Sequence, residues 1–436
     1  MVRKKLELVP TTTVNPLQGL LQDMAEDGTI VTSAADVALK WRYLDFRNVK
    51  LDIPILALEW LFGSRGLLAG RLLQLRATFS KGKSSFMYAL YGMAQASKHK
   101  YAPGKAPVWA LHVETEGAAS PPDYIASFNC DPVGLGMAEQ ASLQGCLGKI
   151  DEFVARVRGG FGGEKGEAGR MIKTKFDDPY DKELESPIMM GIDSLSSLGL
   201  EAQVEEDVAD MTSTPGLASH SRIMRDWLRR RCHRLMTCQA LLILTSHETA
   251  KIETGVKAFG GPKKSSLAQE AIGIHATYGA DVEATRYVDK ETGTVLGDVI
   301  TLKTFKNKIS PRGRQLPMYL VWNQGFDWAK TEVRFLLEDP NSPFNMNDEQ
   351  IGTCSRQGGR NPGIVCPKLG PTVFKSEEEF VVALHANTDL VRLCREKMRI
   401  RGFGFDFETQ YSNKEIEETN NGMEGNTEAV PAAGNA

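Results

Sequence analysis

The sequence predicts an α/β fold: a mostly parallel sheet covered by helices on both faces. The first observation is that short apolar segments recur along the chain, each separated from the next by enough sequence for a helix. This alternation is typical of parallel sheets, whose strands are buried on both faces. The candidate strands are Leu72–Leu75, Val108–Val113, Ile188–Ile192 and Leu241–Thr245.

The second observation is a change of pattern after residue 280. Val282–Val288 and Asp298–Lys306 read as two strands, and the polar segment 289–293 between them ends in Gly293. Strands joined by a short polar turn containing glycine form a hairpin. We therefore expect an antiparallel addition to the parallel sheet.

Composition limits the class of protein. The chain has 436 residues, a net charge of −3, 42% hydrophobic residues and 25% charged residues, as expected for a globular protein of roughly two or three domains. Apolar runs such as 240–244 are far shorter than the ~20 residues of a membrane span. With no signal-peptide pattern near the start and seven scattered cysteines, we expect a cytoplasmic protein with no membrane partner.

Four regions are expected along the chain. Residues 1–50 read as a small helical lead-in that serves oligomerisation, 51–335 as the α/β core, and 336–410 as a C-terminal subdomain ending with a helix over Glu377–Ala386. Residues 411–436 carry five glutamates among Asn, Gly and Ala, and such a composition cannot bury a core, so we expect a disordered acidic tail. The glycine-rich stretch Gly159–Gly169 follows no strand and reads as a flexible loop.

A phosphate-binding loop follows the first strand. Ala77-Thr-Phe-Ser-Lys-Gly82-Lys83-Ser84 fits the pattern G-x-x-x-x-G-K-[ST] except at its first position. In such a loop, backbone N–H groups bind a phosphate chain at the start of a helix. The predicted nucleotide-binding residues are Ala77, Thr78, Phe79, Ser80, Lys81, Gly82, Lys83, Ser84 and Ser85, with Lys83 on the phosphates and Ser84 on Mg²⁺. An ordinary strand–turn–helix is the alternative.

Carboxylates end two further strands. Asp193 follows the apolar run 187–192, where a second Mg²⁺ ligand is expected; an ordinary turn aspartate is the alternative. Glu114 and Glu116 end the strand before it, and strand alternation would place both on one side, with Glu116 nearest the mouth of the sheet. Either could orient a water molecule for hydrolysis, or be a solvated loop residue.

The fourth strand ends at His247, where an imidazole can hydrogen-bond a terminal phosphate; a satisfied loop histidine is the alternative. Residues 249–269 then combine glycines and a proline with lysines and an aromatic residue. Loose backbone, cations and a stacking side chain suit single-stranded DNA, and a plain mobile surface loop is the alternative. The predicted DNA contacts in this segment are Lys251, Lys257, Phe259, Lys263 and Lys264.

Two further groups of residues can each be interpreted in two ways. Lys306 and Lys308 share one face of a strand by period two and could hold phosphates or be ordinary edge-strand lysines. Cys354 and Cys366 bracket a Gly/Pro-rich loop, but their spacing is not that of zinc ligands. Thiols are the expectation there, with a metal site as the alternative.

These segments, in this order, resemble the RecA family of recombination ATPases over roughly residues 50–330, and within it the phage UvsX type. Residues 53–71 look like the family's lead into its phosphate loop, 114–116 like the segment with the catalytic glutamate, and 192–195 like the Mg²⁺-side strand. Thr245-Ser246-His247 is similar to the UvsX form, which has His where bacterial RecA has Gln.

The resemblance implies roles for these residues. Glu116, Lys83 and His247 would be catalytic, Ser84 and Asp193 would bind Mg²⁺, and Lys306 and Lys308 would reach the ATP of a neighbouring subunit. Residues 199–222, including Arg222, and residues 249–269 would be the two DNA loops. The tail would resemble the acidic tail of RecA, which moderates DNA access.

The sequence departs from the family in several places. Ala77 replaces glycine, Ser84 replaces threonine, and Glu114 replaces the more usual aspartate. One extra residue separates Glu116 from Tyr124, so we do not expect Tyr124 to stack on the adenine.

The implied function is an ATP-dependent recombinase with a RecA-like P-loop NTPase core. It would form filaments on single-stranded DNA and exchange strands with duplex DNA, using ATP and Mg²⁺. A hexameric helicase or ring motor and a non-enzymatic DNA-binding scaffold are the alternatives. The sequence leaves open whether single-strand-binding or loader proteins take part.

Overall fold

The computed structural model describes residues 43–96, 109–117, 119–158, 188–201, 204, 217–251, 263–265, 268–346, 348–358 and 362–400. All of them belong to one compact unit. Most of the expected segment 1–50, the glycine-rich stretch 159–169 and the tail at 411–436 lie outside the described residues. The described end of the expected helical lead-in is extended instead, as β1 (Tyr43–Asp45) and β2 (Arg47–Asn48). The expected region boundaries stay predictions.

A mixed sheet of nine strands forms the centre, in the order β15-β14-β13-β12-β5-β9-β8-β6-β7. From β12 to β7 all neighbours are parallel, which confirms the predicted fold class. The strands of this part are β5 (Leu72–Ala77), β6 (Trp109–Glu114), β7 (Leu135–Glu139), β8 (Ile188–Asp193), β9 (Ala240–His247) and β12 (Tyr278–Val288).

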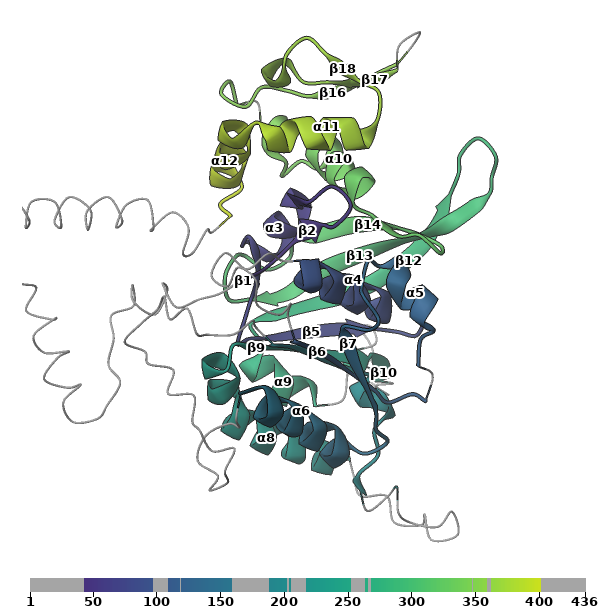
Figure 1. The fold of residues 1–436 in the computed structure, drawn as a ribbon, viewed down its shortest axis with the longest axis vertical. Helices are drawn as coiled ribbons and strands as arrows, with labels where there is room; N and C mark the ends of the chain where they lie inside the picture. The colour runs from purple at the N-terminus through teal and green to yellow at the C-terminus, as the bar shows by residue number, and fades with distance from the viewer. Residues whose placement is uncertain are drawn as a thin grey trace, which may run out of the picture. The chain divides into compact units, whose positions relative to one another are not determined.

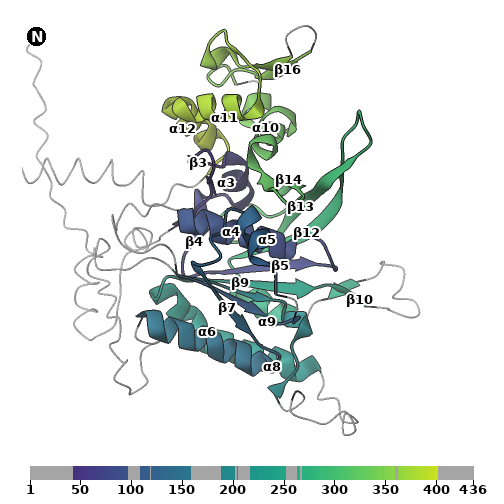
Figure 2. The same ribbon diagram turned by 45° about the vertical axis from the view of Figure 1, so that its right-hand side comes forward.

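Helices cover both faces of the sheet (Figures 1 and 2). One face carries α4 (Lys83–Ala96) and α5 (Pro122–Ser127), and the other carries α6 (Leu143–Arg158), α8 (Leu217–Thr237) and α9 (Gln269–His275). Apolar residues of α6, α8 and α9 form one buried cluster with Leu242, Leu244 and other strand residues. Every residue of β8 and β9 is buried, because a strand with helices on both faces has no solvent side.

The antiparallel part contains the predicted hairpin, β12–β13, and two further strands. β12 pairs with β13 (Val295–Asn307), β13 with β14 (Gln315–Val321), and β14 with β15 (Gly325–Asp327). Its far end projects beyond the sheet in both views (Figures 1 and 2). Shorter pairs are β1 with β4 (Gly66–Leu68), β2 with β3 (Ile53–Pro54), and β10 (Thr249–Lys251) with β11 (Lys263–Ser265).

The C-terminal part packs on α10 (Trp328–Glu338) and α3 (Leu56–Phe62). The predicted helix is confirmed as α11 (Glu377–Ala386), but a further helix, α12 (Thr388–Lys397), follows it. Arg395 of α12 donates two hydrogen bonds, of 2.7 and 2.8 Å, to the buried carboxylate of Glu59 in α3. A charge pair thus connects the C-terminal helices to the core.

The expectation of thiols at Cys354 and Cys366 is wrong, because the two form a disulfide. β16 (Ser355–Gln357) pairs antiparallel with β17 (Gly363–Val365), and β17 pairs with β18 (Val373–Phe374). Ser355 lies opposite Val365, so Cys354 and Cys366 are the next facing pair, with Cα atoms 4.3 Å apart. Across the described residues, no cluster of three or more His, Cys, Asp or Glu could hold a metal ion.

None of the described helices is both long and apolar enough to cross a membrane.

Candidate functional site

The predicted phosphate loop connects β5 to α4: β5 ends at Ala77 and α4 begins at Lys83. Gly82 has φ +82°, and a Cβ there would lie 2.1 Å from Cδ1 of Ile300 in β13. The left-handed backbone therefore favours glycine here, and a larger residue would also have to displace the end of the Ile300 side chain. Ala77 is part of the strand and 1% exposed, so alanine fits this first position of the motif.

Lys83 lies at the centre of the site. Its Nζ donates to the carbonyl of Thr78 at 3.1 Å and lies 3.3 Å from Nδ1 of His247. Burial lowers the pKa of Lys83, and the charges of Asp193, Glu116 and Glu248 oppose that shift. The cation thus has carboxylates from three strand ends around it.

Glu116 and His247 are brought together from β6 and β9. Nε2 of His247 lies 2.9 Å from Oε1 of Glu116, and the Ser194 hydroxyl donates to the same oxygen at 2.8 Å. Burial raises the pKa of Glu116, but the hydrogen bonds from His247 and Ser194 outweigh burial and lower it. The carboxylate is therefore held ionised and oriented, although its side chain is 42% exposed.

Asp193 ends β8 beside these groups and is 6% exposed. Thr245 in β9 donates to its Oδ1 at 2.5 Å. The Asp193 carboxylate and the Ser84 hydroxyl at the start of α4 are oxygen donors, and Mg²⁺ is bound by oxygen, usually through one or two carboxylates plus phosphates and water. The donor set fits that ion.

The side chain of Glu114 has different partners from that of Glu116, whereas strand alternation had predicted that the two lie on the same side. Its Oε1 accepts the backbone N–H groups of Thr115 at 3.0 Å and Glu116 at 2.8 Å. Because β6 ends at Glu114, the alternation does not extend to Glu116. Burial raises the pKa of Glu114, while hydrogen bonds, first that of His112, lower it to below its usual value. Glu114 shapes the turn that carries Glu116.

A cavity of about 470 Å³ opens beside the phosphate loop. Ser80, Gly82, Ser84 and Ser85 line one side, and Tyr124, Trp322 and Asn323 are among the residues that line the rest. Oη of Tyr124 lies 2.8 Å from Oγ of Ser85. The sequence did not predict that Trp322 lines the site, and the expectation that Tyr124 does not stack on the adenine stays a prediction. The one sequence signal for either residue was its aromatic character.

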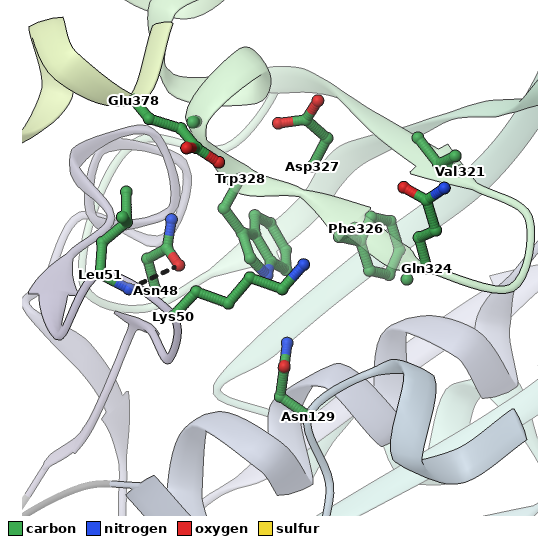
Figure 3. Close-up of a pocket in the computed structure, with 12 residues that line it drawn as sticks. Asn48, Lys50, Leu51, Asn129, Val321, Gln324, Phe326, Asp327, Trp328 and Glu378 are labelled. Carbon is green, nitrogen blue, oxygen red and sulfur yellow. Dashed lines mark hydrogen bonds between the residues drawn. The ribbon is translucent and has the colours of Figure 1, made fainter. Parts of the chain in front are cut away.

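A second cavity, of about 130 Å³, is also lined by residues of the β14–β15 turn (Figure 3). Lys50, Asn129 and Trp328 face one another across it. None of the phosphate-loop residues lines it, so it is separate from the predicted nucleotide site.

Lys306 and Lys308 do not meet the phosphate loop of their own chain. Lys306 pairs with Gly279, which is level with Gln74 in β5, so both lysines lie toward the amino end of the parallel strands. The ammonium of Lys306 bonds the carbonyl of Gly273, and both lysines lie within 3.5 Å of the Ile274 carbonyl. They share one face, as period two predicts.

Comparison with known proteins gives distant matches to RecA. The RecA protein of Streptococcus gordonii is 24% identical over 356 residues, covering 80% of this chain and 78% of that protein. That of Thermotoga maritima is 24% identical over 272 residues, covering 62% and 63%. That of Cereibacter sphaeroides is 24% identical over 199 residues, covering 44% and 54%. These matches support membership of the RecA family. The chain spans about half the length of the Cereibacter relatives that it matches, and no family model matches it.

The predicted DNA-binding residues that the structure describes fall in two places. Arg222 is exposed on α8, as are Arg225, Arg229 and Arg230, which sequence reasoning had not assigned. Lys251 pairs with Lys263 and Ala250 with Lys264, across β10 and β11. Lys257 and Phe259 lie outside the described residues.

Proposed function

We propose that this protein is an ATP-dependent DNA recombinase that forms filaments on single-stranded DNA and promotes strand exchange. The observation that carries the proposal is the contact series Lys83–His247–Glu116. It joins the predicted phosphate-binding lysine to the predicted water-orienting carboxylate. The distant RecA relatives support the same class of activity.

ATP is assigned to the phosphate loop and the cavity beside it. Backbone N–H groups of residues 78–84 and the N-terminus of α4 would bind the phosphates, and Lys83 would neutralise part of their charge. The base would lie between Tyr124 and Trp322, whose ring faces suit stacking. Mg²⁺ held by Ser84 and Asp193 would neutralise charge on the β- and γ-phosphates.

Glu116 is assigned to the attacking water. Ser194 and His247 both contact Oε1 of Glu116, which leaves Oε2 to accept a hydrogen bond from a water molecule. An ionised carboxylate is needed for that role, and the lowered pKa of Glu116 supports it.

The position of Lys306 and Lys308 supports the proposed assembly into a filament. Gln74 and Ala77 are three strand residues apart, about 10 Å at about 3.4 Å per residue, and the loop lies beyond Ala77. The two lysines therefore require a second subunit if they are to contact nucleotide. ATP between subunits explains how hydrolysis would loosen a filament, because loss of the γ-phosphate removes contacts that hold two subunits together.

DNA is assigned to α8 and to the segment after His247. β10 begins two residues after His247, so a change in the imidazole position would act on a strand that starts the segment 249–269. Arg222 and its exposed neighbours on α8 supply cations for the phosphates of DNA. A cytoplasmic location and the closer likeness to UvsX-type proteins, which rests on His247, belong to the same proposal.

The test is ATP hydrolysis by the purified protein without DNA, with single-stranded DNA and with duplex, at several salt concentrations. We expect strong stimulation by single strands that weakens as salt rises, because phosphate contacts release counterions. Strand exchange between a single strand and a homologous duplex would then separate a recombinase from a ring helicase, which would unwind duplex instead. Hydrolysis that is indifferent to DNA would refute the DNA assignment.

A further inference from the structure

Phe79 is an exposed aromatic residue in the middle of the phosphate loop. It is 72% exposed, yet its ring is stacked on the imidazole of His247, with centroids 4.3 Å apart and an interplanar angle of 30°. A side chain this exposed adds little to the buried core. Its place in the loop therefore needs a reason other than folding.

The stack completes a set of three contacts around the imidazole. Nδ1 of His247 lies 3.3 Å from Nζ of Lys83, and Nε2 lies 2.9 Å from Oε1 of Glu116. An ammonium group can only donate, so Nδ1 accepts and Nε2 carries the hydrogen that is donated to Glu116. The two ring nitrogens make the hydrogen bonds at the edge of the imidazole, and Phe79 is stacked on one of its faces.

These contacts restrain different motions. The two hydrogen bonds fix where the nitrogen atoms lie, but a histidine ring has a broad torsional minimum about χ2. A flat neighbour 4.3 Å away limits the tilt of the ring. The restraint matters most when one hydrogen bond is lost.

That loss is expected when nucleotide binds, so this inference rests on the proposed function. Lys83 must turn from His247 toward the phosphates, and the imidazole then keeps only Glu116 and Phe79. We propose that Phe79 is a positioning residue that keeps His247 aligned on Glu116 after Lys83 has released it. Loop and histidine thereby move together, and the position of the loop is passed to the segment after His247.

The first test needs no nucleotide. An aromatic ring over an imidazole shifts the resonances of the imidazole C–H groups through its ring current. In protein labelled with ¹³C-histidine, the His247 signals are those absent from His247→Gln. Phe79→Leu should move them toward ordinary histidine positions, whereas Phe79→Tyr should leave them in place. Trp109→Leu is the matched control, because Trp109 is 43% exposed at the start of β6, away from the loop.

The second test is kinetic. Phe79→Leu should lower kcat for ATP hydrolysis about 3- to 10-fold, which is about 0.6–1.4 kcal/mol at 1.36 kcal/mol per tenfold and matches an aromatic pair. KM for ATP should stay unchanged, because the alignment of His247 matters only after ATP has bound. Phe79→Tyr keeps an aromatic ring and should retain the kcat of the unaltered protein. In a His247→Gln background, where no ring remains to be stacked, Phe79→Leu should have no further effect.

The results of the resonance and kinetic tests decide whether Phe79 positions His247. Unmoved His247 resonances in Phe79→Leu would overturn it, and so would an equal loss of kcat in the His247→Gln background, since Phe79 would then act elsewhere. A wild-type protein that does not hydrolyse ATP would refute the proposed function, whereas the resonance shifts would still decide whether Phe79 orients His247.

Discussion

Glu116→Gln separates the charge of this residue from its shape. The amide oxygen of glutamine can keep both hydrogen bonds that Oε1 accepts, from His247 at 2.9 Å and from Ser194 at 2.8 Å. The amide nitrogen then replaces Oε2, and it presents a donor where the attacking water needs an acceptor. The local structure should survive while the proposed catalytic role is lost.

The size of the loss follows from that role. Removing a positioned general base typically costs about 10²- to 10⁴-fold in rate, or about 2.7–5.4 kcal/mol at 1.36 kcal/mol per tenfold. ATP binding should change little, because no phosphate-loop residue is altered. The expected variant binds ATP and single-stranded DNA but stalls.

Glu114→Gln is the matched control. Its amide oxygen can still accept the two backbone N–H groups that shape the turn, so kcat should fall less than about tenfold, below the effect of a lost general base. The assay is phosphate release at saturating single-stranded DNA, with ATP binding measured by a fluorescent analogue. Normal hydrolysis by Glu116→Gln would refute the assignment, and a larger loss in Glu114→Gln would transfer the role to Glu114.

Three further predictions concern the site and the fold. Ser194→Ala removes a hydrogen bond that lowers the pKa of Glu116, so this pKa should rise and the acidic limb of kcat against pH should move to higher pH. Gly82→Ala places a side chain on a backbone with φ +82°, costs about 1–2 kcal/mol in backbone strain alone, and should weaken ATP binding in a titration. Arg395→Met leaves the buried carboxylate of Glu59 unpaired, and should lower the free energy of unfolding in urea by about 3–5 kcal/mol.

Each of these predictions has a result that would contradict it. An unchanged acidic limb in Ser194→Ala would show that Glu116 does not set it. Normal ATP affinity in Gly82→Ala would show that the loop adapts. Arg392 pairs with Asp389 and Glu396 at the surface, so Arg392→Ala should cost less than about 1 kcal/mol. An equal loss in that variant would contradict the buried-pair argument.

The sheet and the centre of the site were predictable because the information is local. Each parallel strand is a short apolar run, and the polar residues that follow it meet at one edge of the sheet whatever the strand order. Lys83, Asp193 and His247 could therefore be grouped before the structure was known. Their individual hydrogen bonds depend on β9 lying between β5 and β8, which the sequence does not state.

The missed features depend on pairings between distant segments. Trp322 reaches the cavity through the pairing of β14 with β13, and Arg395 reaches Glu59 across 336 residues. The disulfide between Cys354 and Cys366 depends on the register of β16 and β17. The sequence spacing of the two cysteines argued against a zinc site but did not predict that they pair. No local pattern encodes a register of that kind.

Phe79 shows that a residue at an unconstrained position of a motif can still make a specific contact. Its position in the phosphate loop is one that the motif leaves free, so sequence reasoning gave it no role beyond nucleotide binding. Its partner His247 ends β9, which pairs directly with β5, and the pairing places Ala77 level with His247. A large flat residue two positions after Ala77 can then cover the imidazole. We infer that the pairing of β5 with β9, more than the loop motif itself, brings the phosphate loop into the group of residues that orients Glu116.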